Sequence, residues 1–166
     1  MRSMFLVPAA GILLVASASA VAATKQTTMG VSANVAANCV IAAEPLSFGS
    51  YDASVEKSGS SDLTVRCSNG TPYTVKLSPG ATGSFSQRLL TSGSNSLEYN
   101  LYTSSAFSSV WGDGTSGTAT QGGFGAGLAV GSAITHTVHG LLPNTDNNQN
   151  APTGNYSDTI TVTVEY

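Results

Sequence analysis

Residues 159–166 form a run in which polar and apolar side chains strictly alternate. Ile160, Val162, Val164 and Tyr166 occupy every second position, with threonine or glutamate between them. Because successive side chains of a β-strand point to opposite faces, this spacing predicts a strand with one apolar and one polar face. The β-branched residues that dominate the run favour the same structure. It is the strongest strand prediction in the chain.

Shorter runs of the same kind recur along the chain and are broken by Gly, Asn, Ser and Pro. Those runs cover residues 46–51, 62–67, 73–77, 97–102, 106–110 and 133–139. No segment after the first 23 residues keeps a helical period over three turns. The pattern therefore predicts an all-β fold with strands at the spacing of a sandwich. Asn69-Gly70 predicts a hairpin turn, whereas residues 115–127 and 141–155 are expected to be loops.

Residues 1–23 have the layout of a secretory signal peptide. Arg2 precedes an apolar stretch, and small residues at 20–23 supply a cleavage site. The apolar stretch is short for a membrane span, and Pro8 interrupts it. The sequence therefore predicts export and no integral membrane segment.

A second alternating segment, residues 29–35, follows the predicted leader. Met29, Val31, Ala33 and Val35 share one face if this segment is extended. The segment has no obvious hairpin partner, so it can pair within its own domain or with another molecule. We interpret it as a strand donated to another molecule, because residues 159–166 offer an apolar edge that no proline or lysine protects. Repeated head to tail, such a contact gives an open fibre.

The charge balance excludes one class of partner. Without Arg2, five basic side chains face nine acidic ones. Binding to nucleic acid requires clustered cations that neutralise phosphates, so we expect no nucleic-acid partner. Ser, Thr, Asn and Gly are plentiful, which predicts a polar and weakly charged surface.

The chain contains two cysteines, Cys39 and Cys67. In an oxidising compartment, one disulfide between them is the expected state. Closing a loop of this length stabilises a domain by roughly 3–4 kcal/mol. The spacing does not match the Cys-x-x-Cys motif of redox-active pairs.

Several patterns that resemble chemical sites have simpler interpretations. His136 and His139 are three residues apart, so a strand places them on opposite faces and a shared metal site is not expected. Gly112-Asp113-Gly114 begins a formal Gly-x-Gly-x-x-Gly pattern, but no predicted helix follows it, and a turn explains it better. No nucleophile elbow or His-Glu-x-x-His motif occurs. We therefore predict no catalytic, cofactor-binding or metal site and no enzyme activity.

These segments together resemble the spore coat protein U-like domain family, the subunit family of archaic chaperone–usher pili. Residues 154–166 are similar to the C-terminal signature of the family, and residues 97–102 and 110–114 to its central motif. Residues 37–39 and 46–51 are similar to its beginning, and Cys67 to its second cysteine. His139 is a local departure, because the family pattern often has tyrosine before the glycine there.

The resemblance implies an incomplete immunoglobulin-like β-sandwich that lacks its last strand. The donor strand of a neighbouring subunit, with Met29, Val31, Ala33 and Val35, would complete it. The acceptor strand, which a chaperone would contact first, would present the following residues: Ile160, Val162, Val164 and Tyr166.

The resemblance also implies partners and boundaries. A periplasmic chaperone would hold each subunit, an outer-membrane usher would assemble the fibre at the cell surface, and no cofactor would be involved. Residues 1–23 would be the signal peptide, residues 24–36 the donor-strand extension and residues 37–166 the pilin domain.

Three functions fit the sequence. The first is a structural pilus subunit that supports attachment and biofilm formation. The second is a secreted spore-coat or matrix protein of the same fold. The third is a monomeric carbohydrate-binding sandwich with a sugar platform formed by Trp111, Tyr99, Tyr102 and Phe107. A donor strand favours the first two, since a monomeric lectin needs no free alternating segment.

Overall fold

The computed structural model describes residues 21–166. Most of the predicted signal peptide, residues 1–20, lies outside the described residues and stays a prediction. The chain divides into two compact units, residues 1–34 and residues 35–166, and we call the second unit the body. In the first unit, residues 21–34 contain no helix or strand and are exposed.

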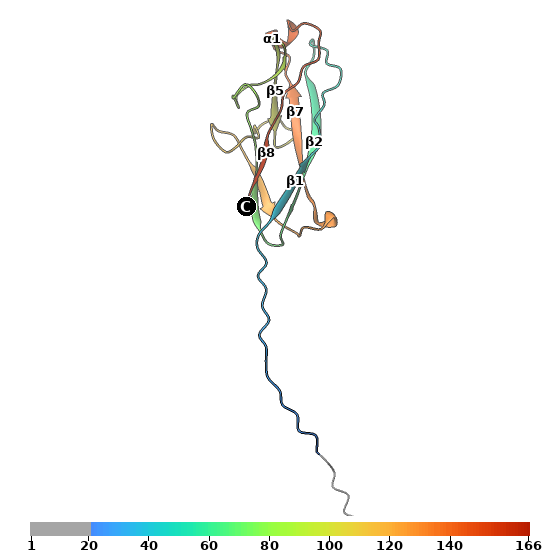
Figure 1. Ribbon diagram of the computed structural model, residues 1–166. Helices are drawn as coiled ribbons and strands as arrows, with labels where there is room; N and C mark the ends of the chain where they lie inside the picture. The colour runs from blue at the N-terminus through green and yellow to red at the C-terminus, as the bar shows by residue number, and fades with distance from the viewer. Residues whose placement is uncertain (1–20) are drawn as a thin grey trace, which may run out of the picture. The chain divides into compact units, whose positions relative to one another are not determined.

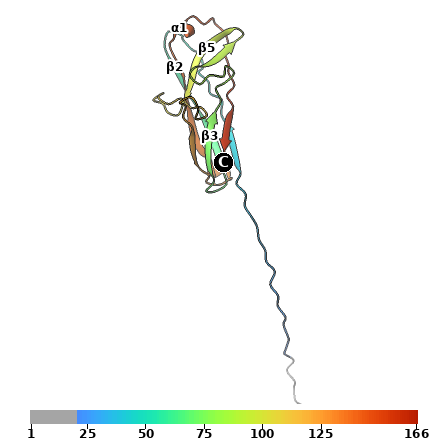
Figure 2. The ribbon, with the colours of Figure 1, turned by 90° about the vertical axis from the view of Figure 1, so that its left-hand side faces the viewer.

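The body is built from two antiparallel sheets (Figures 1 and 2). The first sheet contains, in order, β1 (Cys39–Ala43), β2 (Lys57–Cys67), β7 (Ile134–Leu142), β5 (Asn95–Tyr102) and β4 (Arg88–Ser92). The second contains β6 (Gln121–Phe124), β3 (Pro72–Leu77) and β8 (Val162–Glu165). A 3₁₀ turn, η1 (Val130–Ser132), precedes β7, and a single helical turn, α1 (Asp146–Gln149), follows it. The predicted all-β fold is confirmed.

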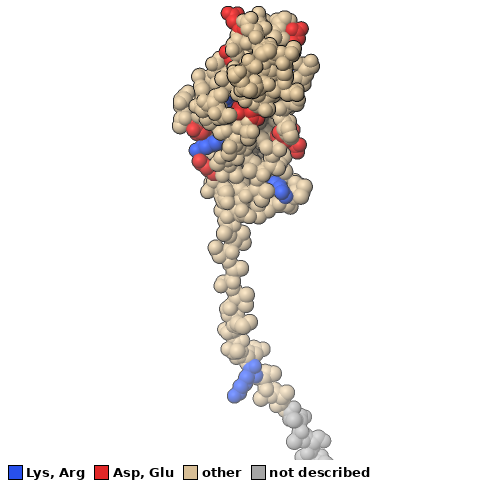
Figure 3. Space-filling view, turned by 45° about the horizontal axis from the view of Figure 1, so that its top comes forward, with Lys and Arg blue, Asp and Glu red and all other residues tan. Residues whose placement is uncertain are grey.

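The core lies between the two sheets and follows the two-residue period of the sequence. β2 contributes Leu63, Val65 and Cys67, which are buried, while the residues between them are partly exposed. β3 contributes its own alternating set, and Trp111 fills the core from the connection between β5 and β6. Charged side chains are few and scattered on the face of Figure 3.

Most predicted strands are confirmed, and two are wrong. Runs 62–67, 73–77, 97–102 and 133–139 lie in β2, β3, β5 and β7, and the closing run forms the shorter β8. Residues 46–51 form no strand, because no neighbouring strand pairs with them. Residues 106–110 form none either, since Phe107 has a φ of 52° and only Val110 makes a bridge, to Tyr102.

β6 lies inside a segment that the sequence predicts to be a loop. Its glycines permit a close approach to β3: a Cβ on Gly122 would lie 2.6 Å from the carbonyl oxygen of Tyr73. With two glycines between Gln121 and Phe124, the strand carries no alternating apolar signal.

The predicted hairpin at Asn69-Gly70 is also wrong. The turn connects β2 to β3, which belong to different sheets, so it carries the chain across the sandwich. Gly70 has a φ of 77°, and its amide donates a hydrogen bond to the carbonyl of Gly125. The Asn-Gly pair indicated a turn correctly, but not which strands the turn joins.

The predicted disulfide is present and links Cys39 to Cys67. The two residues stand opposite each other in the β1–β2 register, and Cys67 is fully buried. The bond therefore fixes the beginning of the edge strand β1 to the inner strand β2.

Replacing Cys39 by serine is expected to lower the free energy of unfolding by about 3 kcal/mol, because the unfolded chain is no longer cross-linked. In a domain of this size the melting temperature should then fall by roughly 6–12 °C. Differential scanning calorimetry of the variant and of the wild type, each with and without a reductant, measures the effect. A melting temperature that neither the substitution nor the reductant changes would contradict a stabilising role.

A buried arginine connects the two sheets. The side chain of Arg88, on β4, is fully buried. Its guanidinium donates to the carbonyl oxygens of Ser78 (2.8 and 3.1 Å) and Trp111 (2.8 Å), and to Oδ1 of Asn100 (2.6 Å). It also lies 5.4 Å from the centre of the Phe85 ring. Within residues 21–166 it forms no salt bridge, so neutral oxygens alone satisfy its charge.

Candidate functional site

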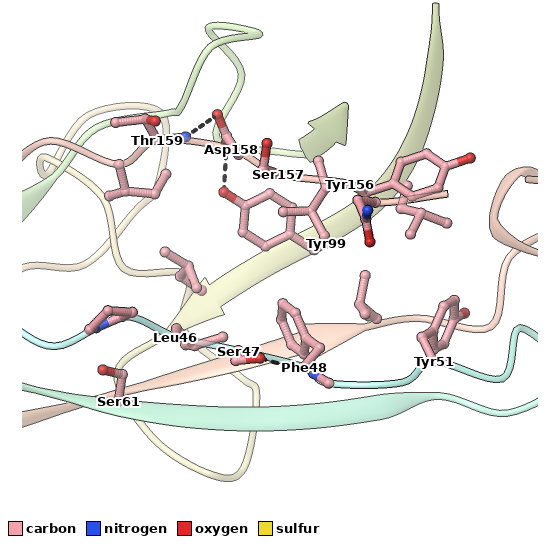
Figure 4. Close-up of a pocket in the computed structure, with 18 of the residues that line it drawn as sticks. Leu46, Ser47, Phe48, Tyr51, Ser61, Tyr99, Tyr156, Ser157, Asp158 and Thr159 are labelled. Atoms are coloured by element: carbon pink, nitrogen blue, oxygen red, sulfur yellow. Dashed lines mark hydrogen bonds between the residues drawn. The ribbon is translucent and has the colours of Figure 1, made fainter. Parts of the chain in front are cut away.

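An open apolar groove of about 1320 Å³ runs along one side of the body. Its two walls are residues 43–53, which follow β1, and residues 151–162, which lead into β8 (Figure 4). Its floor consists of core side chains: Leu63, Leu77, Leu97, Tyr99, Leu101, Val138 and Leu142. The floor residues are themselves buried, and the groove lies directly over this part of the core.

Apolar and aromatic side chains line both walls. Leu46, Phe48 and Tyr51 come from the first wall, and Tyr156, Ile160 and Val162 from the second. All six are half-buried and pack against the core. Figure 4 shows Leu46, Phe48 and Tyr51 along one wall, facing Tyr99 and Tyr156. The rings of Phe48 and Tyr99 meet edge to face, with their centres 6.3 Å apart.

Each wall is continuous with an edge strand. β8 pairs only with β3, and β1 pairs only with β2, so within the described residues each has one edge without a strand partner. Such an edge presents backbone N–H and C=O groups that can form hydrogen bonds with an added strand. The groove thus combines apolar lining and free backbone groups, which is the arrangement that binds an extended peptide.

A polar anchor holds the second wall in place. The Tyr99 hydroxyl donates to Oδ2 of Asp158 at 2.7 Å, and Oδ1 of Asp158 accepts from the amides of Ala81 and Thr159. Figure 4 shows Asp158 between Tyr99 and Thr159. Burial, and then the hydrogen bond to Asp158, raise the pKa of Tyr99 well above its ordinary value, so the hydroxyl remains a donor. A Cβ on Gly80 would collide with this carboxylate.

Asn148 fixes the far end of the groove, where the connection after β7 crosses β5. The side chain is fully buried: Oδ1 accepts from the Glu98 amide at 2.6 Å, and Nδ2 donates to the carbonyls of Glu98 and Pro143. The Thr145 hydroxyl caps α1 by accepting from the Asn148 amide. The connection is ordered by side-chain hydrogen bonds, for which periodicity in the sequence gives no signal.

Only two of the four predicted acceptor residues line the groove. Ile160 and Val162 line the groove, and Val164 packs half-buried against the core without lining it. Tyr166 is 59% exposed. Sequence reasoning missed Tyr156, although it stands in phase with Ile160, and it missed the wall formed by residues 46–51.

The predicted donor residues are fully accessible. Met29, Val31 and Val35 are 85, 85 and 88% exposed, and Ala33 is exposed as well. Residues 21–38 form no strand. The assignment of Met29, Val31, Ala33 and Val35 as donors stays a prediction.

Two further expectations concern aromatic and ionisable side chains. Trp111 is fully buried and donates its indole N–H to the Val75 carbonyl, so the proposed sugar platform that includes Trp111 is wrong.

His136 is buried, whereas His139 is half-buried at an alternate position of β7. Among residues 21–166, no group of three or more metal-ligating side chains gathers. No helix in this range is long and apolar enough to cross a membrane.

Acidification is expected to destabilise the body through His136. Its Nε2 lies 2.9 Å from the Tyr73 hydroxyl and its Nδ1 lies 3.0 Å from Oε1 of Gln121. These contacts suit a neutral ring that donates from Nδ1 and accepts at Nε2. Burial lowers the pKa of His136 below its ordinary value of 6.5. Between that lowered pKa and about 6.5 the unfolded chain binds more protons, so the free energy of unfolding falls as the pH drops through this window.

Urea denaturation at pH 7.5, 6.5, 5.5 and 5.0 measures this effect. A His136→Gln variant, which cannot titrate, should show a smaller decrease in stability between pH 6.5 and 5.0 than the wild type. Equal decreases in both proteins would contradict the assignment of the effect to His136.

The chain is similar to known proteins over most of its length. The model of the Spore Coat Protein U domain family matches residues 25–163. Protein U of Myxococcus xanthus is 31% identical over an alignment of 172 positions, which covers 92% of this chain and 91% of that protein.

A solved structure is similar as well. It is a chain in the crystal structure of the CsuC–CsuE chaperone–tip adhesion subunit pre-assembly complex, from the archaic chaperone–usher Csu pili of Acinetobacter baumannii. The TM-score is 0.54 and the identity is 25%. The match covers 80% of the present chain and 40% of that chain.

Proposed function

This chain belongs to the Spore Coat Protein U domain family, and on that premise we propose that it is a structural subunit of a surface pilus. Neighbouring copies, or a copy and a related subunit, join by donor-strand exchange. The segment with Met29, Val31, Ala33 and Val35 is the donor, and the groove of the next subunit is the acceptor.

The open groove carries this proposal. A finished sandwich buries its core under a strand on every side, whereas here core residues such as Leu101 and Val138 line an open groove. Each wall is continuous with a strand that has one unpaired edge among residues 21–166, and the donor segment offers apolar side chains at the two-residue spacing of a strand. A strand laid beside β8 would bury its apolar face on the groove floor and bond through its backbone.

Completion of the core explains why such a joint would last. The donor segment alone contributes a modest apolar area and loses conformational entropy when it is ordered. Covering the groove also removes the half-buried wall residues of the acceptor, such as Phe48 and Ile160, from water. The resulting fibre is expected to persist through slow unfolding as well as through equilibrium stability.

The same groove needs protection before assembly. An exposed apolar groove with free strand edges promotes aggregation. We assign its temporary coverage to a periplasmic chaperone, by analogy with the chaperone–subunit complex in which the similar chain was solved. An outer-membrane usher would then exchange the chaperone for the donor strand, after export directed by the predicted signal peptide in residues 1–23. No step in this route requires catalysis by the subunit or a cofactor. Attachment to surfaces and biofilm formation are the roles that we propose for the finished pilus.

A coat or matrix protein is the second candidate. The family description and the similarity to Protein U of Myxococcus xanthus favour it. Both candidates use the same groove and donor. Genes for a chaperone and an usher next to the gene of this protein would separate the pilus from a coat assembled without them.

Removing residues 24–36 from the mature chain tests the proposal. The truncated protein, purified as a complex with its chaperone, should bind a synthetic peptide of residues 29–35 in exchange for the chaperone. It should form no fibres by itself, because it has lost its donor. Negative-stain microscopy and size-exclusion chromatography measure both results. Fibres of normal appearance from the truncated protein would refute donor-strand exchange.

A further inference from the structure

Four of the exposed large apolar side chains of the body lie at one end. Val40, Phe124, Leu128 and Val130 are 42, 70, 41 and 81% exposed, and we call these four residues the apolar pole. Val40 and Phe124 lie in β1 and β6, and Leu128 and Val130 lie in the connection between β6 and β7. A cluster of exposed apolar side chains on a weakly charged protein marks a surface that contacts another molecule.

The sheet register brings the four residues to the same end. Val40 pairs with Arg66 near the start of β1, and Phe124 pairs with Pro72 at the end of β6. The Arg66 guanidinium donates to the Leu128 carbonyl at 3.2 Å, and Val130 opens η1 just before β7. Figure 1 shows the start of β1 and the beginning of β7 at the lower end of the body.

The donor segment limits how far the apolar pole of one copy can lie from the copy that accepts its donor strand. Only residues 36–38 separate Val35 from Cys39, where β1 begins. Four residue steps span at most about 14 Å. If Val35 lies in the groove of another copy, the apolar pole must therefore come close to that copy.

Strand direction selects the end of the neighbour that the apolar pole meets. All the paired strands of the body are antiparallel, so we expect the donor to run antiparallel to β8 as well. Its last residue, Val35, then lies at the end of the groove that residues 51–53 and 151–156 line. This end is remote from the apolar pole, because the Tyr51 hydroxyl donates to the Pro143 carbonyl and the side-chain amide of Asn144 donates to the Ser54 carbonyl, just beyond the end of β7.

We propose that the apolar pole of each copy packs against this far end of the next copy and forms a second contact beside the donated strand. The far end carries Val55, which is 57% exposed. This inference rests on the proposed function. The second contact would restrict the angle between successive subunits, which the short segment of residues 36–38 alone leaves free.

Photo-cross-linking in fibres of the full mature chain tests the contact. Val130 is replaced by p-benzoylphenylalanine, and the matched control carries the same probe at Ser108, which is exposed on a different loop. Each probe-bearing chain is mixed with a ninefold excess of wild type, so that fibres form. We expect the probe at 130 to cross-link to residues 51–56 of another copy at least tenfold more often than the probe at 108.

The possible outcomes distinguish the second contact from donor-strand exchange itself. Cross-links from position 130 no more frequent than from position 108, in well-formed fibres, would overturn the contact and leave donor-strand exchange intact. Cross-links from position 130 to a different region of the neighbour would also overturn it. Failure of the wild type to form fibres would overturn the proposed function, and the contact with it.

Discussion

Replacing Val31 by aspartate is expected to reduce fibre formation at least a hundredfold. Val31 is 85% exposed in the free chain, so the body should fold as before. In the fibre this side chain would enter an apolar groove, and burying an unpaired carboxylate there costs several kcal/mol. The yield of fibres, measured by sedimentation and electron microscopy, gives the effect, and an unchanged melting temperature shows that folding is intact.

Ser32→Asp is the matched control for this substitution. It adds the same charge one residue further along, on the opposite face of the extended donor. Fibres of the control should form at nearly the wild-type yield. Equal losses in both variants would mean that the apolar face does not decide donation, and normal fibres from Val31→Asp would contradict the donor assignment.

Replacing Arg88 by alanine is expected to cost roughly 3–5 kcal/mol of stability. The guanidinium donates to acceptors on Ser78, Asn100 and Trp111. Its removal takes the donor from the Ser78 and Trp111 carbonyls and leaves Oδ1 of Asn100 with the Leu101 amide alone. Arg88→Lys should recover part of the loss, because an ammonium keeps the charge but cannot reproduce the planar fork. Equilibrium unfolding in urea measures the free energy of unfolding of the wild type, Arg88→Ala and Arg88→Lys.

Arg66→Ala is the control for the loss of an arginine. Arg66 makes one side-chain hydrogen bond, to the carbonyl of Leu128, at the surface. Its replacement should cost less than about 1 kcal/mol. If the two alanine variants lost equal stability, the buried network around Arg88 would not be the source of the effect.

The alternation of side chains predicted which residues face the core better than it predicted which backbones pair. Residues 46–51 illustrate the difference: Leu46 and Phe48 point inward as the pattern indicates, yet the backbone forms no strand. Alternation reflects burial on one side, whereas a strand also needs a neighbour within hydrogen-bonding distance. Here the neighbouring position is the open groove itself.

Other elements left no periodic signal in the sequence. β6 depends on glycines that allow close contact with β3, and glycine-rich segments suggest a loop. Arg88 and Asn148 are polar residues whose burial depends on acceptors and donors from distant segments, such as Trp111 and Pro143. Local pattern cannot indicate such partners, because they meet only once both sheets are in place.

One wall of the groove was predictable, and the other was not. Ile160 and Val162 belong to the strongest alternating run in the chain, and they line the groove. The opposite wall follows from the absence of a strand beside residues 46–51, which is a property of the whole topology. The floor likewise depends on the whole topology, because its core residues come from both sheets.

Electron cryo-microscopy of assembled fibres at side-chain resolution would test donor-strand exchange most directly. Residues 29–35 of one copy should lie antiparallel to β8 of the next copy, with Met29, Val31, Ala33 and Val35 directed into its groove. Density that places these residues in the groove of their own copy, or a groove that stays empty within the fibre, would contradict the account.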